Sequence, residues 1–432
     1  MIIVDRALHD RETAGRPISV GVLGAGFMAR GFVSHVTNSV PGMRVAAICA
    51  RRTAQAHDVA RLAGLAGFEA HEPADVDAAD GGTVCVTDDP LAITRSETID
   101  CLVDMTGSVA YGAMAALDAF AHGKHVVLMN AELDATLGPY LRKRAEEAGV
   151  LVTASDGDQP GVQLNLWRFV RGLGLIPRVL GNVKGLQDPY RTPTTQADFA
   201  ARWGQNPTMV TSFADGSKVN FEQAIVANAT GFGVHRRGML GMDHRGHVDQ
   251  LVDRYDIDVL RTMGGAVDYV VGATPGPGVY CLAEHPDPAQ QHYLELFKLG
   301  RGPLYSFYQP YHLCHFEAPT TVARVVLFSD VVGRCSDVPA VEVVAIAKRD
   351  LKVGEILDSY GEFTSYGEIE NATVVRRARL LPEGLTEGCR LVRDVPKDAP
   401  IRWDDVVPPE SLAHDLYRHQ WEEIEDRSVP TT

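Results

Sequence analysis

A short glycine turn between an apolar run and a helical pattern constrains the fold of this chain more than any other feature. Residues 18–23 (Ile-Ser-Val-Gly-Val-Leu) are typical of a buried parallel strand, and a helical pattern begins after Gly26. Gly24 allows a tight turn, Gly26 lets the backbone approach a pyrophosphate, and Ala29 is small enough for the helix to lie close to the strand. The positive end of that helix then faces an anion. The turn therefore predicts a dinucleotide-binding unit. Its predicted cofactor contacts are Gly24, Gly26, Phe27 and Met28.

Strand and helix patterns alternate from the glycine turn to about Ala154, as they do in a doubly wound parallel sheet. We therefore expect an α/β Rossmann domain over residues 1–154. The predicted strands are Ser19–Leu23, Arg44–Ala50, Cys101–Met105, His125–Met129 and Val150–Thr153, and the predicted helices include Gly107–His122 and Leu137–Ala148.

The residues after the second predicted strand indicate which dinucleotide is preferred. Folds that prefer NAD tend to place Asp or Glu there, where it accepts from the ribose 2′-hydroxyl. This chain has Arg51 and Arg52 instead, and guanidinium groups bind a 2′-phosphate well. We therefore predict NADP(H) in preference to NAD, the alternative being an ordinary solvated loop. Thr106, Gly107 and Asn130 follow the next two predicted strands and are expected to reach the same cofactor.

Charge and cysteine usage exclude several classes of partner. The net charge is −15 without a basic stripe, which argues against nucleic acids and anionic membranes. The seven cysteines are scattered and form no C-x-x-C pair, as is typical of reduced thiols. No apolar run approaches the roughly 20 residues of a membrane span. We expect a cytoplasmic homo-oligomer, a dimer, that binds a small-molecule substrate.

Two further regions follow the predicted Rossmann domain. We predict an α+β substrate domain over residues 155–335, with an irregular polar segment around Pro193 and Pro207. A helix over Ser217–Ala229 follows, and a helix over Cys314–Phe328 is expected to pack back on the first domain. Residues 336–432 are expected to form a small β-rich domain that ends in a charged helical tail.

Several blocks resemble known oxidoreductases. The glycine turn, Thr106-Gly107 and Asn130 resemble the homoserine-dehydrogenase-like oxidoreductases, and residues 347–351 with Gly354-Glu355 resemble a SAF domain. The whole chain is similar to a narrower group, the deoxyxylulose-phosphate-reductoisomerase-like (DRL) enzymes. The blocks that carry this likeness are Gly157-Asp158-Gln159-Pro160, Lys184-Gly185, Asn206-Pro207, Ser212-Phe213, Asp215-Gly216, Lys218, Ala227-Asn228-Ala229-Thr230-Gly231 and Pro310-Tyr311-His312-Leu313.

Two departures limit what the resemblance implies. Homoserine dehydrogenases have lysines after the position of Asn130, whereas this chain has Ala131 and Glu132, so homoserine dehydrogenase activity itself is not expected. Reductoisomerase-like relatives often carry Arg before the Pro-Tyr-His block, whereas this chain has Gln309.

Hydride transfer requires a general acid or base near the substrate oxygen. Lys184 follows a probable strand, and Lys218 and Glu222 lie four residues apart on one helix face. We predict that Lys184 or Lys218 exchanges the proton, while Asp158 and Glu222 orient them or bind hydroxyls. The alternative for Lys218 and Glu222 is a surface ion pair. The predicted substrate-binding residues are Glu132, Asn182, Asn228 and His312.

We predict no metal site, because His312 and His315 alone do not supply three converging ligands. A magnesium-type ion held by Asp158 and Asp188 is the less favoured alternative for a phosphorylated substrate.

The sequence predicts an NADP-dependent oxidoreductase acting on a small polyhydroxylated compound, with or without a phosphate group. The resemblance implies a substrate such as a deoxyketose phosphate, with or without rearrangement of the carbon skeleton. The alternatives are a plain sugar or hydroxy-acid dehydrogenase and a dinucleotide-sensing protein that has lost catalysis.

Overall fold

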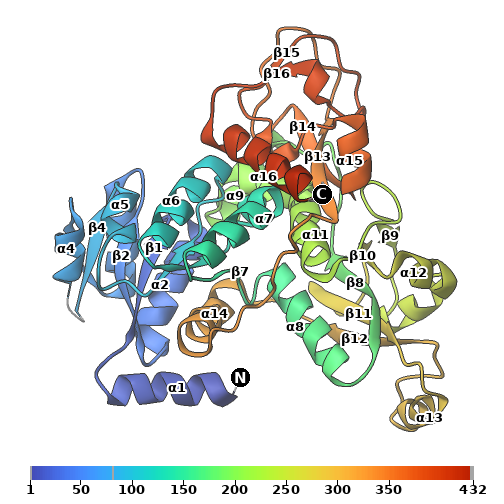
Figure 1. The fold of residues 1–432 in the computed structure, drawn as a ribbon, viewed down its shortest axis with the longest axis horizontal. Helices are drawn as coiled ribbons and strands as arrows, with labels where there is room; N and C mark the ends of the chain where they lie inside the picture. The colour runs from blue at the N-terminus through green and yellow to red at the C-terminus, as the bar shows by residue number, and fades with distance from the viewer. Residues whose placement is uncertain (1, 80–81, 429–432) are drawn as a thin grey trace. The chain divides into compact units, whose positions relative to one another are not determined.

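The computed structural model describes residues 2–79 and 82–428. It forms two compact units (Figure 1), which do not follow the three successive domains predicted from the sequence. Unit 1 comprises Met1–Asp158, Leu313–Arg334 and Asp415–Thr432, and unit 2 comprises Gln159–His312 and Cys335–His414. The sequence prediction treated each region as a continuous stretch of chain, whereas both units are built from separated segments.

Unit 1 contains a seven-stranded, fully parallel sheet of order β3-β4-β2-β1-β5-β6-β7. The predicted Rossmann fold is confirmed, although β3 and β4 were not predicted. The strands are β1 (Ile18–Leu23), β2 (Met43–Cys49), β3 (Ala66–Glu69), β4 (Thr83–Thr87), β5 (Cys101–Asp104), β6 (His125–Leu128) and β7 (Val152–Ala154). The helices are α1 (Ile2–Thr13), α2 (Phe27–Ser39), α3 (Thr53–Ala63), α4 (Pro73–Asp77), α5 (Pro90–Thr94), α6 (Val109–Ala121) and α7 (Ala131–Glu147).

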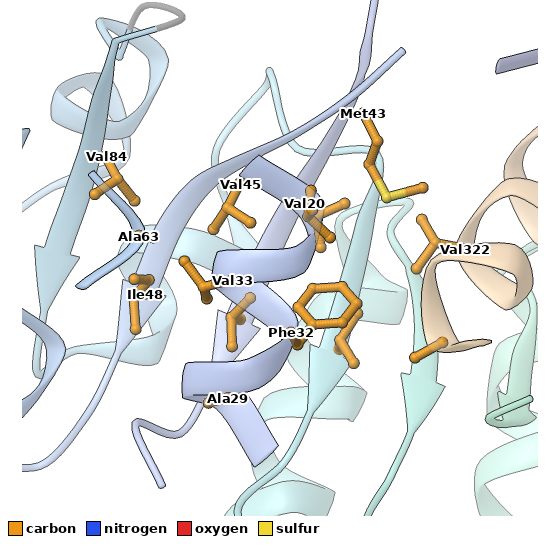
Figure 2. Packing of buried hydrophobic residues seen from close by; sticks show 14 of the residues in the cluster. Val20, Ala29, Phe32, Val33, Met43, Val45, Ile48, Ala63, Val84 and Val322 are labelled. Atoms are coloured by element: carbon orange, nitrogen blue, oxygen red, sulfur yellow. The ribbon is translucent and has the colours of Figure 1, made fainter. Parts of the chain in front are cut away.

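The apolar core of unit 1 joins the sheet to helices from both ends of the chain. Figure 2 shows Phe32 of α2 beside Val20 of β1, with Val322 of α14 (Cys314–Phe328) nearby. Full burial of a Phe side chain stabilises a fold by roughly 1.5–3 kcal/mol. The prediction that the Cys314–Phe328 helix packs on the first domain is therefore confirmed. A buried ion pair supports it, because Arg324 Nη1 lies 2.9 Å from Asp156 Oδ1.

The chain returns to unit 1 a second time at its C-terminal end, through α16 (Leu412–Ser428). The side-chain amide of Gln420 takes the place of a helical hydrogen bond in α7. Its Oε1 accepts from the backbone N–H of Tyr140 at 3.0 Å, and its Nε2 donates to the carbonyl of Thr136 at 3.4 Å. Glu423 pairs with Arg144 at 2.8 Å. These contacts fix α16 along α7.

Unit 2 is built on a mixed five-stranded sheet of order β12-β11-β8-β10-β9. Strands β8 and β10 are parallel, and β11 is antiparallel to both β8 and β12. The strands are β8 (Ile176–Lys184), β9 (Met242–Asp243), β10 (Ala266–Val271), β11 (Gly278–Glu284) and β12 (Leu304–Gln309). The helices are α8 (Gln159–Gly172), α9 (Pro193–Trp203), α10 (Pro207–Asp215), α11 (Ser217–Thr230), η1 (Val248–Asp253), α12 (Ile257–Met263) and α13 (Pro288–Leu296).

The predicted irregular segment is wrong for residues 193–203 and 207–215, which form the helices α9 and α10, whereas residues 204–206 between them lie outside both helices. Pro193 and Pro207 occupy first-turn positions, where a missing N–H is not needed. Thr192 and Asn206 cap the two helices through side-chain oxygens that accept backbone N–H groups. These prolines start helices rather than interrupting them.

Residues 335–414, called the C-terminal lobe below, form small antiparallel sheets within unit 2, so this region is β-rich as predicted. Its likeness to a SAF domain stays a prediction. Its elements are β13 (Val341–Ala347), β14 (Ser365–Asn371), α15 (Ala372–Ala378), η2 (Glu383–Leu385), β15 (Arg390–Leu391), η3 (Trp403–Asp405) and β16 (Val406–Val407). Among the helices of the described residues, none combines the length and apolar character needed to cross a bilayer.

Candidate active site

The glycine turn of unit 1 leaves room at the start of α2. Gly24 has a φ of +108°, and a Cβ there would lie 3.0 Å from the carbonyl oxygen of Met105, so the turn requires glycine. Gly26 precedes α2 and provides no side-chain cap for the helix. A Cβ built on Gly26 would meet no heavy atom within 4 Å. The open space and the uncapped N–H groups fit a pyrophosphate, and Phe27 and Met28 begin the same helix.

A buried carboxylate that the sequence analysis did not single out holds together the loops after β5 and β6. The Oδ1 of Asp104 accepts from the backbone N–H of Thr106 at 2.9 Å and from its hydroxyl at 2.7 Å. The Oδ2 of Asp104 accepts from the Asn130 amide at 2.9 Å. Thr106 and Asn130, predicted cofactor contacts, are thus brought side by side, and Gly107 continues the loop at a φ of +69°.

Asn130 also caps α7, because its Oδ1 accepts from Leu133 N at 3.1 Å. Its side chain is therefore engaged in holding the loop, and its contact with a cofactor stays a prediction. Burial raises the pKa of the Asp104 carboxyl, while the hydrogen bonds from Thr106 and Asn130 oppose that rise. An Asp that ends an otherwise apolar strand was the sequence signal for this network.

Arg51 and Arg52 follow β2 directly, and both are exposed. Within residues 2–79 and 82–428 neither makes an ion pair, so both guanidinium groups are available to an anion. This arrangement fits the predicted phosphate contact.

Glu132 and Asp158 are predicted site residues that lie in unit 1. Glu132 is fully buried in the first turn of α7, where its charge contributes to the raised pKa of Asp104. Asp158 is the last residue of the first segment of unit 1, directly before α8. Their roles toward a substrate stay predictions.

The predicted lysines and their partners come together in unit 2. Lys184 ends β8, and Lys218 and Glu222 lie in the buried first turns of α11. The Asn182 amide, on β8, donates to Glu222 Oε2 at 3.4 Å. The idea that Lys218 and Glu222 form a surface ion pair is wrong, because their exposed fractions are only 7% and 5%.

Gln159 extends this cluster toward His312. Its Nε2 donates to Asn182 Oδ1 at 2.8 Å and lies 3.4 Å from His312 Nε2. Gln159 was quoted only as part of a matching block in the sequence, and its position on the first turn of α8 shows its place in the site. We call Gln159, Asn182, Lys184, Lys218, Glu222 and His312 the lysine cluster.

The electrostatics of the lysine cluster favour proton exchange. Burial lowers the pKa of Lys184, and the neighbouring Lys218 lowers it further. Glu222 and Asp215 act in the opposite direction, since each negative charge favours the ammonium form. A lysine with a lowered pKa passes between its charged and neutral forms closer to neutral pH than an exposed lysine does.

The structure gives Asn228 a role other than the predicted substrate contact. Its Oδ1 accepts from the backbone N–H groups of Ala340 and Val341 at 2.8 and 3.1 Å, and its Nδ2 donates to the Val341 carbonyl. Its amide therefore joins α11 to β13. A substrate would have to break these bonds to reach it.

Within the described residues no three or more His, Cys, Asp or Glu side chains gather in a way that fits a metal ion. Asp188, the less favoured ligand, pairs with Arg191 at 2.9 Å. His315 packs against Gly31 of α2, which agrees with its predicted structural role.

Two family models match consecutive parts of the chain. Residues 24–154 match the NAD-binding domain of homoserine dehydrogenase, and residues 157–318 match the catalytic domain of oxidoreductase DRL. Each match covers less than half of the chain, and both are to domains of oxidoreductases. The resemblance stated from the sequence is thereby confirmed, and every member of the lysine cluster lies inside the second match. No curated protein matches the chain.

Solved structures show distant likeness. A putative oxidoreductase from Klebsiella pneumoniae is 20% identical, with 40% of this chain aligned to 44% of that chain at a TM-score of 0.27. Biliverdin reductase from Synechocystis sp. PCC 6803, in complex with biliverdin and NADP+, is also 20% identical, with coverage of 40% and 48% at a TM-score of 0.28. The chain thus spans less than half the length of these two. A homoserine dehydrogenase from Thiobacillus denitrificans is 15% identical, with coverage of 89% and 98% at a TM-score of 0.45.

Proposed function

We propose that this oxidoreductase uses NADP(H) to interconvert a carbonyl and a hydroxyl group of a small polyhydroxylated, phosphorylated compound such as a deoxyketose phosphate. The observation that carries the proposal is the lysine pair, half-buried Lys184 and buried Lys218, beside Glu222 in the segment that matches a DRL catalytic domain. Such a pair supplies both a proton donor and positive charge for an anionic substrate.

In this proposal the backbone of unit 1 binds the dinucleotide. The turn at Gly24 and Gly26 and the uncapped start of α2 receive the pyrophosphate. Arg51 and Arg52 contact the 2′-phosphate through charge-assisted hydrogen bonds, which favours NADP(H) over NAD(H). When bound, the nicotinamide supplies or accepts the hydride.

The lysine cluster handles the substrate oxygen. In the reducing direction one lysine, in its ammonium form, donates a hydrogen bond to the carbonyl oxygen. It then transfers a proton to that oxygen as negative charge develops on it. In the oxidising direction the neutral amine of the same lysine accepts the hydroxyl proton. Glu222, held by Asn182, offsets part of the positive charge of the two lysines.

Two other functions are distinguishable by the same experiment. A plain sugar or hydroxy-acid dehydrogenase would return a product with an unchanged carbon skeleton. A dinucleotide-sensing protein would bind NADPH without oxidising it, although the lysine pair with its carboxylate partner favours an enzyme.

The test is NADPH oxidation and NADP+ reduction, followed by absorbance, with a panel of phosphorylated ketoses, aldoses and keto acids. We expect turnover with a phosphorylated polyhydroxy compound and faster turnover with NADP(H) than with NAD(H). NMR of the product shows whether the carbon skeleton has rearranged. Tight NADPH binding without turnover on any member of the panel would contradict the proposal.

A further inference from the structure

The helix that carries Lys218 and Glu222 is enclosed on two sides. Every residue of α11 from Ser217 to Asn228 is buried. The helix contacts α8 and β10 on one side and β13 and β14 of the C-terminal lobe on another. Figure 1 shows α11 between β8 and the pair β13–β14. The position of its side chains therefore depends on a segment that lies more than 100 residues further along the chain.

Polar contacts, rather than apolar packing alone, fix α11 to the C-terminal lobe. Backbone N–H groups of β14 donate to two α11 side chains: Gly367 N to Ser217 Oγ at 2.9 Å, and Ile369 N to Asn220 Oδ1 at 2.8 Å. Because hydrogen bonds are directional, these two bonds together fix the rotation of α11 about its axis and its distance from β14. That rotation decides where Lys218 and Glu222 point.

A buried ion pair lies at the N-terminal end of α11. Lys348, the residue after β13, places Nζ 2.9 Å from Asp215 Oδ2, and their side chains are 3% and 0% exposed. The remaining donors of Lys348 reach the carbonyls of Arg191 and Glu362 at 2.9 and 2.7 Å. The other oxygen of Asp215 accepts from Ser217 N at 2.8 Å and so fixes the first turn of α11.

We propose that Asp215 and Lys348 are positioning residues of the active site: the pair fixes the first turn of α11 and holds a buried negative charge beside the catalytic lysines. The inference rests on the proposed function of Lys184 and Lys218. It makes the C-terminal lobe part of the catalytic machinery, because the charge of Lys348 opposes the rise that burial causes in the pKa of Asp215.

The charged groups around Asp215 and Lys348 predict the direction in which the pKa of Lys184 shifts. The charges of Lys218, Glu222 and Asp215 all affect that pKa. Asp215 and Lys348 in turn face Glu383, whose pKa burial raises well above its ordinary value. Asp358 and Glu362 complete the charged surroundings. Asp215 therefore supplies a negative charge that favours the ammonium form of Lys184.

The test measures the pKa of Lys184 without needing a substrate. Competitive acetylation with acetic anhydride across a range of pH values, with peptides quantified by mass spectrometry, gives the midpoint for each lysine. Asp215→Asn keeps the size of the side chain and an oxygen for Ser217 N, but it removes the charge. We expect the Lys184 midpoint to fall by about one pH unit, the lower end of the effect of one nearby opposite charge.

A double variant separates charge from stability. Asp215→Asn alone leaves Lys348 buried without its partner, which lowers the unfolding temperature, whereas Asp215→Asn with Lys348→Met removes both charges. We expect the double variant to recover stability and to keep the lowered Lys184 midpoint. A wild-type midpoint in both variants would show the pair to be purely structural and would overturn the proposal.

The matched control lies in the same lobe. Lys352 and Asp394 form an exposed ion pair at 2.8 Å, and Lys352→Met should leave the Lys184 midpoint unchanged. A control variant that moves the midpoint as far as Asp215→Asn does would also overturn the proposal. Because the labelling is independent of turnover, failure of the proposed reaction and failure of this inference give different results.

Discussion

The cofactor loops of unit 1 and the lysine cluster of unit 2 are built in opposite ways. The glycine turn depends on backbone conformation and on backbone neighbours, and it leaves Phe27, Arg51 and Arg52 exposed. The lysine cluster depends on buried side chains, and the ion pair behind it joins residues separated by 133 positions. Binding at a backbone site survives the loss of one side chain, whereas proton transfer in a buried set of charges does not.

The largest effect is expected for substitutions in the lysine cluster, the buried one of the two sites compared. Met keeps most of the length of a lysine but removes its charge and donors, so Lys184→Met and Lys218→Met should both fold and bind NADPH. We expect at least one of them to lower kcat by about 10²-fold, the scale for loss of a general acid. Steady-state kinetics on the best substrate of the panel is the measurement, with Lys352→Met as the control. Normal turnover in both variants would move the proton donor to Glu132 or His312.

A second prediction tests whether the cofactor loops of unit 1 also depend on one buried side chain, that of Asp104. Asp104→Ala leaves the Thr106 N–H and the Asn130 amide without their buried acceptor. We expect a loss of about 2–3 kcal/mol in the free energy of unfolding, measured with urea, together with weaker NADPH binding. The exposed Asp58, paired with Arg61 at 2.9 Å, gives the control Asp58→Ala. Equal effects of the two variants would mean that the buried carboxylate has no special role.

A third prediction uses pH. Burial raises the pKa of Asp134, in the first turn of α7, to about 7. Because its pKa in the unfolded chain is about 3.9, the folded state disfavours ionisation. The cost is absent below about pH 4 and is fully present above pH 7. Asp134→Asn should therefore stabilise the protein more at pH 8 than at pH 5, by on the order of 2 kcal/mol. Thermal unfolding at the two pH values measures this difference, and a gain that does not change with pH would contradict it.

The smallest effect is expected at the exposed arginines. Each contact with a 2′-phosphate is exposed to solvent, so Arg51→Ala should weaken NADPH binding only several-fold and leave NADH binding nearly unchanged. Isothermal titration calorimetry with both cofactors is the measurement. The control is Arg61→Ala, in the last turn of α3. Equal affinity of the wild-type protein for the two cofactors would remove the basis for predicting NADP(H).

Much of unit 1 was predictable because residues close together in the sequence mark its strands, helices and binding turn. Apolar strands alternating with helices identified the Rossmann fold, and the Gly24 turn located its binding loop. The start of α7 was placed six residues too late, at Leu137 instead of Ala131, near Gly138-Pro139. A proline inside a helix usually signals a break. Here the helix is continuous, and Gln420 bonds to the freed backbone groups next to the proline.

The lysine cluster was predictable only in part. Lys184, Lys218 and Glu222 were found because matching blocks and helical spacing mark them in the sequence. Asp215 was quoted only as part of a matching block and Lys348 only within the residues that resemble a SAF domain, since no local pattern connects them. The structural role of Asn228 was missed for the same reason, because its partners at residues 340 and 341 lie at the start of a strand formed much later in the chain.

The returns of α14 and α16 to unit 1 have a consequence for synthesis on the ribosome. Residues up to Asp158 emerge first, yet the helix that contains Val322 and the one that contains Gln420 complete their packing. The nascent nucleotide-binding domain must therefore remain incomplete, with part of its apolar surface uncovered, until the residues up to Gln420 have been translated. Such late closure is typical of chains that engage chaperones during synthesis.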